Sequence, residues 1–112
     1  MTPSDEHGQA RQQLLALAGR RKARRYDWPR DWRPRSVRDP ETGDLLSDEG
    51  AWEVIMRALE EGTPLHEVVL DNPPGRKAYT MDIPSQYGTI YVKLRLGSGY
   101  VLAKSFHYSE RQ

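Results

Sequence analysis

Residues 89–108 restrict the fold of this chain more than any other stretch, because they read as two alternating strands joined by a glycine-rich turn at residues 97–99. One face of the first strand is apolar and the other is aromatic and basic: Ile90, Val92, Leu94 and Leu96 against Tyr91, Lys93 and Arg95. The second strand contains Lys104 and ends at residues 106–108. A hairpin with one apolar face needs a layer packed on that face, and its basic face suits contact with a polyanion.

The middle of the chain predicts the packing layer. Trp52, Ile55, Met56 and Leu59 recur at helical spacing within residues 51–61. Ser47 or Asp48 is placed to cap the start of this helix, and Gly62 to end it. Beyond Pro64 the period changes to two, which predicts short strands at residues 67–70 and 77–83. We therefore expect an α+β domain in which one or two helices pack on a small antiparallel sheet of three to four strands.

Residues 1–45 differ in composition from residues 46–112. We interpret the first part as a basic N-terminal arm, rich in Pro, Trp and Arg, with a short helix over residues 10–25, and the second part as the core domain. Trp28 and Trp32 lie in the arm and are costly to leave exposed. They are expected to pack onto the core, to bind a partner or to stack on nucleic-acid bases.

The residue types exclude several kinds of site. The chain has no cysteine, so neither a disulfide framework nor a thiolate nucleophile is available. His7, His66 and His107 are scattered and do not match a usual metal-ligand spacing, so neither a metal nor a cofactor is expected. No run approaches the roughly 20 apolar residues that span a bilayer, and no signal-peptide pattern is present. These features predict a cytoplasmic protein without a membrane partner.

The register of the terminal hairpin decides which side chains share its polar face. A two-residue loop pairs Leu94 with Ala103 and Lys93 with Lys104, whereas a three-residue loop turns the second strand over. The first register places Lys104 beside Tyr91 and Lys93, and the second places His107 there. A bulge near the strand end would admit both, and the sequence leaves these alternatives open.

The polar side chains of these strands suit the cleavage of RNA without metal. That reaction needs a base for the 2′-hydroxyl, cations to stabilise charge on the phosphate and an acid for the departing 5′ oxygen. The suitable residue types on neighbouring strands are Lys77, Tyr91, Lys93, Arg95 and His107. The requirement for a 2′-hydroxyl would make RNA, and not DNA, the substrate. The same composition is also typical of a solvated sheet face, so the alternative is a non-catalytic module that binds nucleic acid or protein.

Two short segments within this order of elements resemble a known family. They are Tyr91-Val92-Lys93 and Ser105-Phe106-His107. Over roughly residues 50–110 the chain resembles the RelE/MqsR-like ribonuclease toxins of bacterial type II toxin–antitoxin systems, with the nearest likeness to the MqsR branch. The resemblance implies a small α+β protein that cleaves mRNA without metal, often at the ribosome, and that is neutralised by a cognate antitoxin.

The resemblance also implies roles for individual residues. By position in the family pattern, Lys77, Tyr91 and His107 would be catalytic. From their positive charge, and not from the resemblance, a second group is expected to bind RNA: Arg76, Lys93, Arg95 and Lys104. The chain departs from the MqsR pattern at His107, where lysine is usual. Residues 1–45 have no counterpart in the family.

Overall fold

In a computed structural model, the described residues are 7–19, 23–25, 31–71, 74–97 and 99–109, without the side chains of residues 19, 23–25, 71, 74 and 76. Within these ranges the chain forms two α-helices and one 3₁₀ helix, namely α1 (Gly8–Gly19), α2 (Asp48–Glu60) and η1 (Pro34–Ser36). The strands are β1 (Ala23–Arg25), β2 (His66–Asp71), β3 (Pro74–Ile83), β4 (Ile90–Leu96) and β5 (Val101–Tyr108).

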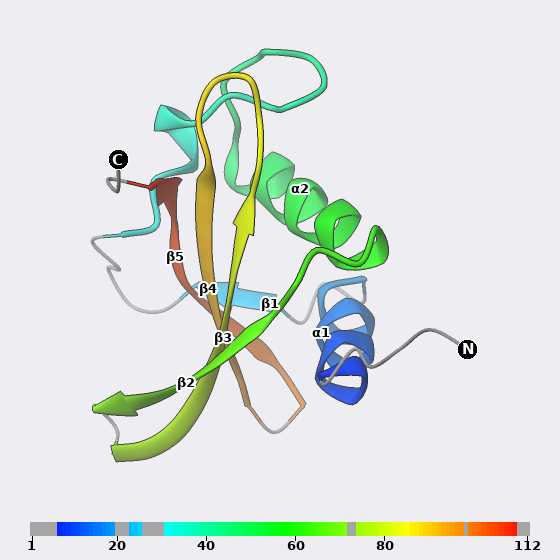
Figure 1. The fold of residues 1–112 in the computed structure, drawn as a ribbon, viewed down its shortest axis with the longest axis vertical. Helices are drawn as coiled ribbons and strands as arrows, with labels where there is room; N and C mark the ends of the chain where they lie inside the picture. The colour runs from blue at the N-terminus through cyan, green and yellow to red at the C-terminus, as the bar shows by residue number, and fades with distance from the viewer. Residues whose placement is uncertain (1–6, 20–22, 26–30, 72–73, 98, 110–112) are drawn as a thin grey trace.

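The strands form a single sheet in the order β1-β5-β4-β3-β2. Strands β2 to β5 are an antiparallel meander, and both α-helices lie on one side of it (Figure 1). The predicted α+β fold, with helices on a small antiparallel sheet, is therefore confirmed. The fifth strand was not predicted, because the helix expected over residues 10–25 ends at Gly19. Strand β1 follows and pairs in parallel with β5. This pairing uses backbone groups, so the hydrophobic periodicity of the sequence does not indicate it.

Helix α2 forms for the reasons that its sequence indicates. The Ser47 hydroxyl accepts a hydrogen bond from the Gly50 amide at 3.0 Å, which satisfies one of the unpaired donors of the first turn. Gly62 follows the helix with φ of +85°, the left-handed conformation that favours glycine. The buried face consists of Ala51, Val54, Ile55, Ala58 and Leu59. Trp52, predicted on this face, is only half-buried and packs at its edge.

The N-terminal third contributes to the same core as the rest of the chain. Leu14, Trp32 and Val37 belong to one buried cluster with the residues of α2 and the sheet. The Trp32 ring lies 5.6 Å from the ring of Phe106, and its Nε1 donates a hydrogen bond to Asp48 Oδ1 at 3.0 Å. Of the three outcomes expected for Trp32, the structure therefore shows packing onto the core. Trp28 lies outside the described residues.

A bulge in the terminal hairpin resolves the question of register. Near the turn, Leu94 pairs with Ala103, as a two-residue loop predicts. The register then shifts, so that Lys93 pairs with Ser105 and Tyr91 with His107. Lys104 is the extra residue, and at a bulge two residues oppose one. Neither uniform register is therefore correct, and the bulge places both Lys104 and His107 on the face of Tyr91.

Candidate functional site

The side of the sheet opposite the helices is the candidate site, and we call it the polar face. Its β4 side chains alternate with buried ones along the strand. The predicted site residues on it are Tyr91, Lys93, Arg95, Lys104 and His107, and all five are half-buried. Half-burial on a sheet face leaves each side chain partly accessible while its neighbours restrict its rotamers.

Tyr91 and His107 form an aromatic contact on the polar face. Their ring centroids are 5.6 Å apart with an interplanar angle of 42°. His107 Nδ1 lies 2.8 Å from the carbonyl oxygen of Tyr108. A carbonyl can only accept, so this contact assigns the ring proton to Nδ1 and makes Nε2 the acceptor of the neutral ring. The neutral His107 ring, which lies beside that of Tyr91, therefore offers Nε2 as a hydrogen-bond acceptor.

Three cations gather beside this aromatic pair. Burial lowers the pKa of Lys104 from its ordinary value, and the positive charges of Arg95 and then Lys93 lower it further. Arg95 Nη2 donates to the Tyr100 hydroxyl at 3.4 Å, while its buried Nε has no hydrogen-bond partner among the described residues. Three positive charges held close together favour an anionic ligand.

The grouping of Lys77 with Tyr91 and His107 is wrong. Strand β3 pairs with β4 so that Thr80 and Asp82, not Lys77, share the face of Tyr91. Because side chains alternate along a strand, Lys77 points to the opposite side of the sheet. There its Nζ lies 3.3 Å from Glu67 Oε1. Arg76 lies on β3, but its side chain is outside the described part of the structure.

An open hollow of about 830 Å³ lies on the polar face next to Tyr91. We call it the β2–β4 hollow, and its walls are His66, Val68, Thr80, Asp82, Gly88, Thr89, Tyr91 and Ser109. Of the predicted site residues whose side chains the structure describes, only Tyr91 lines it. Asp82 was not predicted as a site residue, although its alternation with Met81 and Ile83 was the available signal. His66 also lines the hollow, whereas its place in the sequence indicated only that it does not match a usual metal-ligand spacing.

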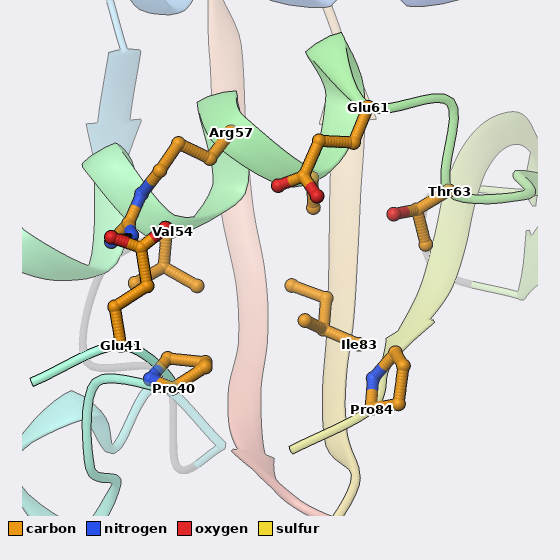
Figure 2. Close-up of a pocket in the computed structure, with 9 residues that line it drawn as sticks. Pro40, Glu41, Val54, Arg57, Glu61, Thr63, Ile83 and Pro84 are labelled. Atoms are coloured by element: carbon orange, nitrogen blue, oxygen red, sulfur yellow. Dashed lines mark ion pairs between the residues drawn. The ribbon is translucent and has the colours of Figure 1, made fainter. Parts of the chain in front are cut away.

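A second, smaller hollow of about 220 Å³ lies between α2, the turn after Asp39 and the end of β3 (Figure 2). Its apolar lining includes Val54 and Ile83. Its basic side chain, Arg57, forms two ion pairs: Nη2 lies 3.1 Å from Asp39 Oδ2, and Nη1 lies 2.7 Å from Glu41 Oε2. These ion pairs tie the turn to α2, and we interpret them as structural.

The ion pair between Asp39 and Arg57 should make stability depend on pH. Burial would raise the pKa of Asp39, but hydrogen bonds from the Glu41 amide and Arg57, with the charge of Arg57, lower it overall. A depressed folded pKa stabilises the fold above the unfolded value of about 3.8, and this contribution is lost as the pH falls through the folded pKa. We expect the difference in Tm between the wild type and Asp39→Asn to shrink below about pH 4. Thermal unfolding from pH 7 to pH 2 measures it, and a difference that stays constant would contradict it.

Comparison of the chain with protein-family models, curated proteins and solved structures gives no match. Among the described residues, no three His, Asp or Glu side chains gather as a metal ion would require. Within the same residues, neither helix has the length and apolar character needed to cross a membrane.

Proposed function

We propose that this protein is a metal-independent endoribonuclease toxin that cleaves mRNA by attack of the 2′-hydroxyl on the adjacent phosphate. The observation that supports the proposal is the contact between Tyr91 and His107, 5.6 Å between ring centroids, on the face that also holds Lys93, Arg95 and Lys104. General acid–base groups and phosphate-binding cations are the two components that this reaction needs.

Each residue has a role that follows from its chemistry. His107 Nε2 takes the proton of the 2′-hydroxyl, whose oxygen then bonds to phosphorus. The bond from phosphorus to the 5′ oxygen breaks, and the Tyr91 hydroxyl donates a proton to that oxygen. The products are a 2′,3′-cyclic phosphate and a 5′-hydroxyl. Lys93, Arg95 and Lys104 stabilise the additional negative charge of the phosphate in the transition state.

The resemblance to RelE/MqsR-like toxins extends the proposal to partners and location. The substrate would be mRNA in the cytoplasm, either alone or on the ribosome. A cognate antitoxin would neutralise the protein by covering the polar face. In this family, lysine usually occupies the position of His107, and histidine suits the same proton transfer near neutral pH.

The gathering of Lys93, Arg95 and Lys104 also supports a second candidate, a non-catalytic nucleic-acid-binding module. Such a module would bind RNA through its phosphates, with an affinity that falls steeply as salt is added. It would leave the RNA intact, which separates the two candidates.

Incubation of the purified full-length protein with end-labelled RNA in EDTA tests the proposed function. We expect cleavage products that end in a 2′,3′-cyclic phosphate. Substitution of one 2′-hydroxyl by a 2′-methoxy group should abolish cleavage at that nucleotide alone, because the nucleophile is removed while the base and phosphate remain. Intact RNA together with salt-dependent binding would instead support the binding module. Induction in cells, followed by mapping of RNA 5′ ends, tests the same activity with ribosomes present.

A further inference from the structure

The β2–β4 hollow adjoins the proposed reacting groups and shares Tyr91 with them. Asp82 and Tyr91 are directly paired across β3 and β4, and Tyr91 is paired on its other side with His107. Tyr91 therefore belongs both to the wall of the hollow and to the proposed acid–base pair. A nucleotide whose phosphate lies at Tyr91 and His107 has a flanking base within reach of the hollow.

Asp82 gives this hollow a charge opposite to that of the neighbouring surface. Its side chain is exposed and lines the hollow, while Lys93, Arg95 and Lys104 on the same face are cationic. A carboxylate repels phosphate and can only accept hydrogen bonds. Asp82 is therefore suited to accept hydrogen bonds from the edge of a base, and the cations are suited to bind the phosphates of the RNA backbone.

The donor pattern of the bases selects one of them. Guanine presents two adjacent donors, N1–H and N2–H, on its Watson–Crick edge, and a carboxylate accepts both at once. Adenine, cytosine and uracil each place an acceptor beside their donor. That acceptor would be repelled by the second carboxylate oxygen. The Tyr91 ring and Val68 line the same hollow and offer flat and apolar surface for a base. A volume of about 830 Å³ is within the range of small-molecule sites.

The geometry points to a guanine-binding subsite in the β2–β4 hollow, with Asp82 as the residue that determines specificity. The inference rests on the proposed function, because it concerns a base flanking the cleaved bond. It adds that cleavage occurs next to guanine.

Binding of non-cleavable DNA separates base recognition from cleavage. Fluorescence anisotropy at low salt would compare 2′-deoxy hexanucleotides that are identical except for one central guanine, hypoxanthine or adenine. Hypoxanthine retains N1–H but lacks the 2-amino group. Loss of a hydrogen bond to a charged group should weaken binding about tenfold for hypoxanthine, and more for adenine. Asp82→Asn should reduce the preference for guanine over adenine to about threefold or less, because its amide group can donate as well as accept.

Glu67→Gln is the matched control, because it makes the same change in charge on the opposite side of the sheet, at a carboxylate paired with Lys77. We expect it to keep the preference for guanine. Equal binding of the three wild-type ligands, or an unchanged preference in Asp82→Asn, would overturn the inference even if RNA is cleaved. A preference for guanine that depends on Asp82, without any cleavage of RNA, would support the subsite and overturn the proposed nuclease.

Discussion

Replacement of Phe106 by alanine is expected to lower the free energy of unfolding by about 3–5 kcal/mol. Phe106 is fully buried and packs against Trp32, which joins the N-terminal third to the sheet. Its backbone accepts from the Arg33 amide at 2.8 Å and donates to the Asp31 carbonyl at 2.7 Å, so the ring lies where the two parts of the chain meet. Loss of the ring removes apolar contacts and leaves a cavity at this junction.

Urea denaturation measured by circular dichroism gives the change in stability. Because typical domains are stable by about 5–15 kcal/mol, the alanine variant can unfold outright, and Phe106→Leu then provides a milder test at about 1–2 kcal/mol. Leu45→Ala is the control, since Leu45 is 59% exposed and its truncation should cost less than about 0.5 kcal/mol. Equal costs for Phe106→Leu and Leu45→Ala would show that Phe106 does not hold the two parts together.

The helix and the meander were predictable because their signals are local. Helix α2 has a capping serine, an apolar face and a terminal glycine, and each of these acts within a few residues. The strands follow from alternation and from turns rich in proline and glycine. The short strand β1 was not predictable, because its pairing with β5 uses backbone groups of residues far apart in the chain.

The candidate site was predictable in part, and the error has a simple physical cause. Tyr91, Lys93 and Arg95 share a face in any register because they alternate on one strand. The bulge at Lys104 adds both Lys104 and His107 to this face and places Phe106 opposite Val92. The alternation of β5 alone does not indicate where such a bulge lies. Lys77 was included because its strand neighbours that of Tyr91, although alternation along β3 puts it on the face of Tyr79 and Met81, opposite that of Tyr91. The same alternation identifies Asp82.

Replacement of His107 by glutamine should reduce the rate of RNA cleavage about 10²–10⁴-fold, the usual contribution of a general acid–base group. Glutamine has a polar side chain of similar length but cannot take up a proton near neutral pH. The fold should be unchanged, because His107 is only half-buried. Tyr91→Phe should also slow cleavage, because it removes the hydroxyl and retains the ring that packs against His107.

Single-turnover cleavage of one end-labelled RNA, compared with binding of its 2′-methoxy analogue, separates chemistry from affinity. His107→Gln should leave affinity for the analogue within about threefold, because the proposed phosphate-binding cations are intact. Lys77→Ala is the control, since it removes a charge on the opposite face, where Lys77 is paired with Glu67, and should cleave within about twofold of the wild type. Cleavage by His107→Gln at the wild-type rate would exclude His107 as the base. A large loss in Lys77→Ala would return Lys77 to the site, against the alternation of β3.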